Sequence, residues 1–109
     1  MSTSSYATDP CLLTASELGR LYRSRALSPV EVAHALLERI GRLQRHINAY
    51  CHLAPHDTLE MARESEARWA NGTARGPLDG VPVSIKDIIL TRGWPTLRGS
   101  RAVDPEQPW

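Results

Sequence analysis

The sequence contains few residues of several types, and the low number of cysteines limits the kinds of site it can form. It contains no phenylalanine, two cysteines and a single lysine, Lys86, among 109 residues. Cys11 and Cys51 stand far apart, with no second Cys or His at metal-ligand spacing. The sequence therefore predicts neither a disulfide framework nor a metal site, and we expect two buried or unreactive thiols.

Long apolar runs and a strong charge of one sign are also missing. No run reaches the roughly 18 residues that a membrane-spanning helix needs, and no charged segment leads into an apolar signal region. The formal net charge is +1, which gives no electrostatic footprint for nucleic acid or for an anionic membrane. We expect a soluble, cytoplasmic protein with neither of these partners.

What is present indicates a globular domain that begins with helices. Hydrophobic residues make up 41% of the chain and charged residues 23%, which is typical of a folded domain. Thr14 followed by Glu17 has the spacing of a helix capping box, and so has Ser28 followed by Glu31. Apolar residues at spacings of three and four then predict a helix from about 29 to 47. A third, more polar helix is predicted from about 57 to 70, with Asn-Gly as its stop.

The histidines carry no recognisable metal site. His52 and His56 have the i, i+4 spacing that could chelate a metal on a helix, but Pro55 between them disfavours a continuous helix. His34 and His46 lack acidic or cysteine companions at ligand spacing. We interpret all four as ordinary histidines.

From Gly76 onward, glycines and prolines surround one strand-like segment, "VPVSIKDIIL", at 81–90. Alternation places Lys86 near the carboxyl end of this strand, where open α/β sheets build their sites. The only other candidate strand is at 50–53, and so few strands do not make a stable sheet. We therefore expect the chain to be the N-terminal piece of something longer. From the residues alone, Lys86 is a catalytic group, a snorkelling side chain or an ion-paired lysine held by Asp87.

The same region resembles the opening segment of the amidase signature family. The family typically reads Gly-Pro-Leu-x-Gly-[Ile/Val]-Pro-x-x-[Val/Ile]-Lys-Asp and then Gly-x-Pro-Thr-x-x-Gly-Ser. The matching residues are Gly76, Pro77, Leu78, Gly80, Val81, Pro82, Ile85, Lys86 and Asp87, followed by Gly93, Pro95, Thr96, Gly99 and Ser100. "LSPVEV", "ERI" and "NAY" in the helical part also look like the family, so the resemblance covers the chain from Leu13 onward.

The resemblance implies a catalytic role for Lys86. In the family the matching lysine belongs to a Ser, cis-Ser, Lys triad, in which the neutral amine takes a proton through the bridging serine and so activates the nucleophilic serine. A lysine acts in this way only when it is neutral, and desolvation beside apolar residues favours that form. An arginine, which stays protonated, could not replace it.

The sequence departs from the family pattern in two respects. It lacks the Gly-Ser-Ser-Gly-Gly segment that supplies both serines and the oxyanion donors, and Ser84 and Ser100 lie in the wrong context to replace them. Asp79 occupies a position where the family often has His, and we interpret it as tolerated loop variation. Gly93, Thr96, Gly99 and Ser100 are interpreted mainly as turn formers near the site, with a direct substrate contact as the alternative.

Together the residues and the resemblance predict an α/β fold, in which N-terminal helices precede the first strand or strands of a mixed sheet flanked by helices. We expect a flexible leader at 1–12 and the N-terminal part of a single amidase domain at 13–109. The implied activity is hydrolysis of a carboxamide on a small molecule, without metal or organic cofactor, in a full-length protein that could form a homodimer. The alternatives are the A subunit of a glutamine-dependent aminoacyl-tRNA amidotransferase, which needs partner subunits and ATP, and a noncatalytic remnant. The substrate-binding residues and the amide itself are unknown from the sequence.

Overall fold

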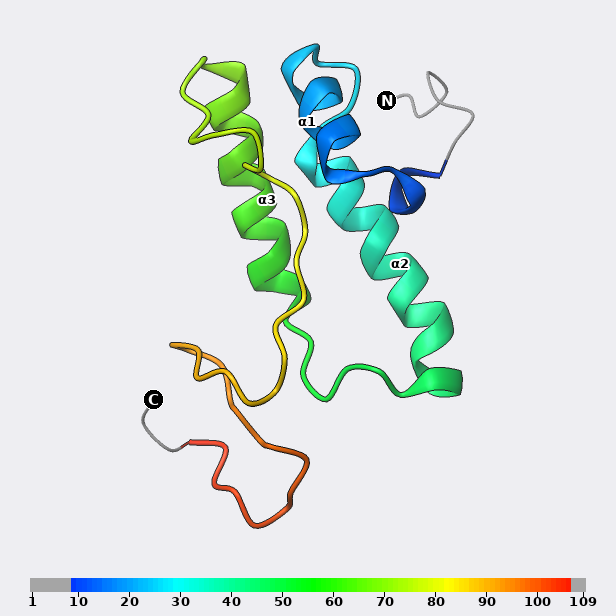
Figure 1. Cartoon of the computed structure of the whole chain (residues 1–109), viewed down its shortest axis with the longest axis vertical. Coiled ribbons are helices and arrows are strands. Elements are labelled where there is room, and N and C mark those ends of the chain that lie inside the picture. Colours follow the sequence, from blue (N-terminus) through cyan, green and yellow to red (C-terminus); the bar gives the residue numbers. More distant parts are fainter. Residues whose placement is uncertain (1–8, 107–109) are drawn as a thin grey trace.

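The computed structural model describes residues 9–106, so positions 1–8 of the expected leader lie outside the described part. The elements are a short 3-10 helix and three α-helices: η2 (Pro10–Leu12), α1 (Ala15–Arg23), α2 (Pro29–Ile47) and α3 (Pro55–Ala70). Helices α2 and α3 lie side by side, and α1 packs across their upper end in Figure 1. None of the helices in this part of the chain is long and apolar enough to cross a membrane.

Both predicted capping boxes are confirmed. The Thr14 hydroxyl accepts a hydrogen bond from the Glu17 backbone N–H at 3.1 Å, and the Glu17 carboxylate accepts one from the Thr14 N–H at 2.8 Å. Ser28 and Glu31 repeat the arrangement at 3.1 and 2.9 Å. Helix α2 then covers the predicted range, Pro29–Ile47. Proline suits its first position, because it has no N–H that would go unsatisfied there.

Helix α3 begins at Pro55, two residues before its predicted start. Proline is favoured at a first helical position because its fixed φ fits the helix, and no side chain caps this end. His52 therefore lies outside the helix, so His52 and His56 do not share a helical face. At the other end, Asn71 is the C-cap and Gly72 has φ +71°, as the Asn-Gly stop predicted.

The hydrophobic core is small and lies where α1, the start of α2 and the end of α3 meet. Its buried members are Leu18, Tyr22, Leu27 and Val32. Trp69 of α3 packs against them, with its ring centroid 6.1 Å from that of Tyr22. This core fixes the upper ends of the helices, to which the segment after α3 is attached.

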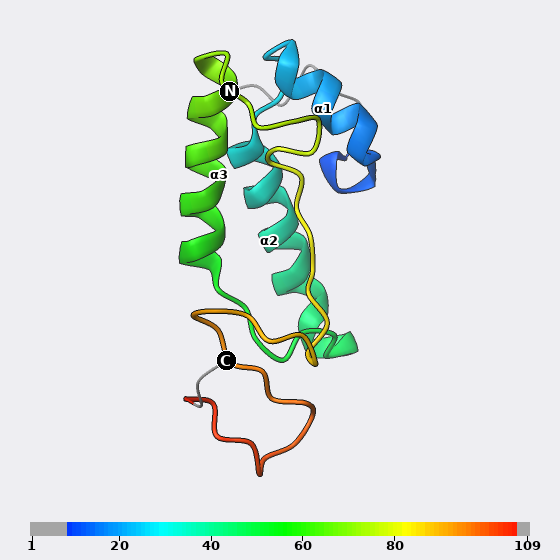
Figure 2. The same cartoon turned by 60° about the vertical axis from the view of Figure 1, so that its left-hand side comes forward.

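The predicted strands do not form. Residues 9–106 contain no strand, and both 81–86 and the candidate at 50–53 have no ladder partner. The segment at 81–86 runs down beside the helices in an extended path (Figure 2), with Val83 84% exposed. A strand exists only when a neighbour accepts its backbone hydrogen bonds, and none of the described residues does so. The predicted α/β arrangement is therefore not shown, and the described fold is helical.

Candidate functional site

Lys86 lies at the end of the extended segment, away from the helical core. Its side chain is exposed, and so are those of Ile85 and Ile88 on either side. The Lys86 carbonyl accepts a hydrogen bond from the Ile89 N–H at 3.0 Å, which closes a turn immediately after the lysine. The apolar shelter that a neutral lysine needs is not supplied by residues 9–106.

The interpretation of Lys86 as an ion-paired lysine is not supported. Within the described part of the chain, Lys86 forms no salt bridge. The Asp87 carboxylate faces the backbone of a later loop instead, where it accepts hydrogen bonds from the N–H groups of Leu97 at 2.9 Å and Gly99 at 3.4 Å. These bonds, with a further one from the Cys51 thiol, hold the pKa of Asp87 below its usual value.

The segment that leads to Lys86 is fastened to α3 through Asp79. Its carboxylate, only 2% exposed, accepts two hydrogen bonds from the Arg68 guanidinium at 2.7 Å each and one from the Ser65 hydroxyl at 2.7 Å. It also accepts a hydrogen bond from the Arg75 backbone N–H at 2.9 Å. The Arg68 guanidinium holds the pKa of Asp79 well below its usual range, despite the opposing effect of burial.

The interpretation of Asp79 as tolerated loop variation did not include this anchoring role, which the structure adds. The sequence shows only that Ser65 and Arg68, three residues apart, share one face of α3. Nothing local in the sequence, however, shows which loop residue will meet that face.

Gly80 completes the attachment by fitting against all three helices. The Tyr22 hydroxyl donates to its carbonyl at 2.9 Å, and the Trp69 indole N–H donates to the preceding carbonyl of Asp79 at 3.0 Å. Gly80 has φ +86°, and a Cβ at this position would stand 2.6 Å from Ser65 Oγ and 2.7 Å from Pro29 Cγ. A glycine is required here because both the backbone conformation and the close approach exclude a side chain.

The loop after Lys86 is held by side chains rather than by regular structure. Gly93 and Gly99 both adopt positive φ, at +87° and +68°, which confirms them as turn formers. Thr96 is buried, and its hydroxyl donates to the Ile89 carbonyl at 3.3 Å. The Trp94 indole donates to Asp57 at 2.9 Å, which ties the loop to the first turn of α3.

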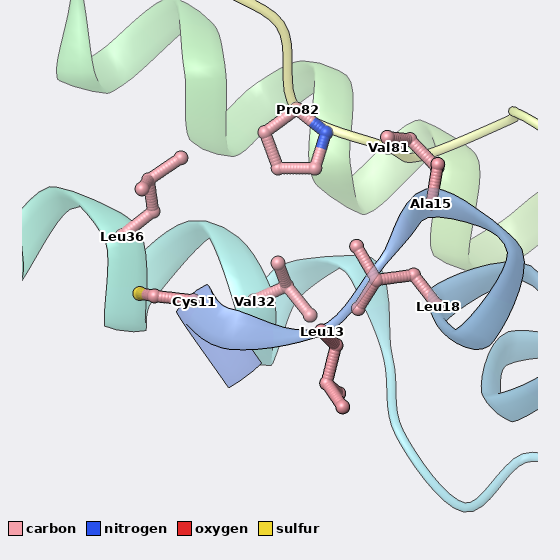
Figure 3. Close-up of a pocket in the computed structure, with 8 residues that line it drawn as sticks. All are labelled: Cys11, Leu13, Ala15, Leu18, Val32, Leu36, Val81 and Pro82. Atoms are coloured by element: carbon pink, nitrogen blue, oxygen red, sulfur yellow. The ribbon is translucent and has the colours of Figure 1, made fainter. Parts of the chain in front are cut away.

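A cavity of about 310 Å³ lies elsewhere, between η2, α1, α2 and the start of the extended segment. Its lining is shown in Figure 3 and consists of Cys11, Leu13, Ala15, Leu18, Val32, Leu36, Val81 and Pro82. The only titratable group in this lining is the Cys11 thiol, and burial raises its pKa. Lys86 is not among the lining residues, so this apolar cavity and the lysine are separate features.

The histidines form no metal centre in the described part of the chain. Residues 9–106 contain no cluster of three or more His, Cys, Asp or Glu that could hold a metal ion. His52 packs near Trp94, with ring centroids 6.3 Å apart, and His34 and His46 are exposed on α2.

Comparison with known proteins assigns the chain to a family. The family model described as Amidase matches residues 31–108, which include Asp79, Lys86 and Asp87. The chain belongs to the amidase family.

The curated relatives in this comparison carry a more particular name. The A subunit of glutamyl-tRNA(Gln) amidotransferase from Salinispora tropica is 38% identical over 101 residues, which cover 93% of this chain and 21% of the relative. The proteins of the same name from Thermobifida fusca and Chloroflexus aggregans are each 40% identical, over 97 and 96 residues, covering 89% and 88% of this chain and 20% of each relative. No solved structure matches the chain. The chain thus spans about a fifth of the length of the curated relatives it matches.

Proposed function

We propose that this chain is the N-terminal part of an amidase and that Lys86 is the general base of its amide-cleaving centre. The observation that carries the proposal is the position of the only lysine. It lies inside the matched region, at the end of an extended segment that Asp79 and Gly80 fasten to the helices. A base of this kind must be held on a rigid support, because small displacements of a reacting group are costly in rate.

The chemistry follows the triad that the family resemblance implies. The neutral Lys86 amine accepts a proton from the bridging serine, which in turn takes the proton of the nucleophilic serine hydroxyl. The serine oxygen bonds to the amide carbon, the C–N bond breaks, and the leaving nitrogen departs with the proton that the lysine returns. Water then cleaves the acyl-serine ester to give the carboxylate. Both serines and the oxyanion donors would come from a segment outside these 109 residues, and that segment would also cover Lys86.

A second candidate shares the first step. The curated relatives named above are the A subunits of amidotransferases, which favours a protein that cleaves the side-chain amide of glutamine and passes the ammonia to a misacylated tRNA. Such a protein would need partner subunits and ATP, whereas a free-standing amidase would need neither. Lys86 would have the same role in both, because both begin by breaking a carboxamide C–N bond.

Ammonia release by the full-length protein distinguishes these candidates. The substrates are glutamine, benzamide and propionamide, each assayed with and without the partner subunits, tRNA and ATP. A free-standing amidase releases ammonia from a simple amide without additions, while a component of an amidotransferase uses glutamine and depends on the additions. Lys86→Ala is expected to remove either activity, since members of a catalytic triad act as a unit. Absence of ammonia release under every condition would contradict the proposed function.

A further inference from the structure

The Asp87 carboxylate connects parts of the chain that are distant in sequence. It follows Lys86 directly and accepts backbone hydrogen bonds from Leu97 at 2.9 Å and Gly99 at 3.4 Å, ten and twelve positions further on. The thiol of Cys51, from the connection between α2 and α3, also interacts with this carboxylate and has its pKa raised by it. Three separate segments therefore meet at one side chain beside the lysine.

The backbone that faces Asp87 is bent to present its N–H groups. Arg98 has φ +55° and Gly99 has φ +68°, two successive residues in the left-handed region. For a residue with a side chain, such as Arg98, this conformation is unfavourable, and it persists only where the surroundings impose it. Successive N–H groups in bent backbone form a concave site that favours an anion, and here the anion is the Asp87 carboxylate.

The same loop is closed at two further points around Lys86. The Lys86 carbonyl is fixed by the Ile89 N–H at 3.0 Å, and the Ile89 carbonyl accepts the hydroxyl of the buried Thr96 at 3.3 Å. No strand ladder fixes Lys86 in the described residues. The turn that follows Lys86 therefore sets the direction of its backbone. The carboxylate of Asp87 holds this turn to the later loop through its bonds to Leu97 and Gly99.

We propose that Asp87 is a positioning residue, which sets the direction of the Lys86 backbone by binding the N–H groups of the 97–99 loop. This inference rests on the proposed function, because it gives Asp87 its effect through Lys86. Asp87 itself touches no reacting atom in this account. Its two carboxylate oxygens accept from two different N–H groups, a task that an Asn side chain cannot reproduce because one of its two positions carries a donor NH₂.

The test compares Asp87→Asn, Asp87→Glu and Lys86→Ala in the full-length protein, with ammonia release from glutamine, benzamide and propionamide as the assay. Asp87→Asn is expected to lower kcat by up to about a hundredfold per folded molecule, because a shift of about 1 Å in a catalytic group has that effect. KM should stay close to the wild-type value, since the loop contact is not a substrate contact. Asp87→Glu keeps both acceptor oxygens but moves them by one methylene, so a smaller fall in kcat with unchanged KM is expected. If Asp87→Asn does not fold, Asp87→Glu takes its place as the test variant. Glu38→Gln is the matched control, because Glu38 is an exposed carboxylate on α2 that pairs with Arg42 and not with the 97–99 loop.

The outcomes separate this inference from the proposed function. A purely structural Asp87 would lower the melting temperature of the variants but leave kcat per folded molecule near wild type, and that result would overturn the positioning role while Lys86→Ala remained inactive. A rise in KM with unchanged kcat would overturn it too, because Asp87 would then act on substrate binding. If Lys86→Ala itself kept wild-type turnover, the base assignment would fail, and with it the ground for this inference.

Discussion

Replacing Gly80 by alanine tests how the extended segment is fastened to the helices. The new methyl group would stand 2.6 Å from Ser65 Oγ and 2.7 Å from Pro29 Cγ, and the residue would have to keep φ +86° or abandon its place. Either response breaks contacts at the same point. The Ser65 hydroxyl would be pushed from Asp79, and the Gly80 carbonyl from the Tyr22 hydroxyl.

The expected cost has three parts. The positive φ costs alanine about 1 to 2 kcal/mol. Loss of the Ser65–Asp79 hydrogen bond costs about 1 kcal/mol, and overpacking against Pro29 about 1 to 3 kcal/mol. We expect Gly80→Ala to lower the free energy of unfolding of the full-length protein by about 3 to 6 kcal/mol.

Urea denaturation followed by tryptophan fluorescence measures this change, since Trp69 lies in the same core. Gly41→Ala is the control: Gly41 lies within α2 with nothing within 4 Å of an added Cβ. Alanine there should stabilise the protein by up to about 1 kcal/mol. If Gly80→Ala unfolded at the same urea concentration as Gly41→Ala, the tight fit of the segment against α2 and α3 would be refuted.

Two further predictions concern acid stability and the isolated chain. Asp79 has a lowered pKa in the folded state, so its ionised form contributes stability that is fully present above its unfolded pKa of about 3.9 and is lost as the pH falls through the folded value. Asp79→Asn should therefore lower stability at pH 7 and flatten its decline below about pH 5, and an unchanged acid profile in urea titrations would contradict this. Expressed alone, residues 1–109 should bind a hydrophobic dye and melt without cooperativity, because Val83, Ile88 and Ile89 are exposed and 81–86 has no ladder partner among residues 9–106. Dispersed backbone NMR signals together with a sharp thermal transition would count against the expectation of a molten chain. The 109-residue chain should also release no ammonia from any amide substrate, because it lacks the Gly-Ser-Ser-Gly-Gly segment that supplies the nucleophile.

The parts of the structure that depend on local interactions could be predicted from the sequence. Ser28, Pro29 and Glu31 lie within four residues of one another and together determine where α2 begins. Helix hydrogen bonds join residues four apart, so a short stretch contains all the information they need. The early start of α3 at Pro55 was missed because no side chain caps that end.

The parts that depend on distant residues could not be predicted. The segment 81–86 has the alternation of a strand, but a strand needs a neighbour, and alternation does not say whether one exists. Asp79 meets Ser65 and Arg68 across more than ten positions, and Asp87 meets Leu97 and Gly99 across ten and twelve. The role of each carboxylate is visible only when the loops are placed in space.

Turnover by Lys86→Arg in the full-length protein tests the central claim most directly. The substitution keeps a long basic side chain at an exposed position, so it disturbs the described fold little, but an arginine that stays protonated cannot accept a proton. Ammonia release from glutamine, benzamide and propionamide should fall nearly to the level of Lys86→Ala at matched folded concentration. Wild-type turnover in Lys86→Arg would contradict the assignment of Lys86 as the base.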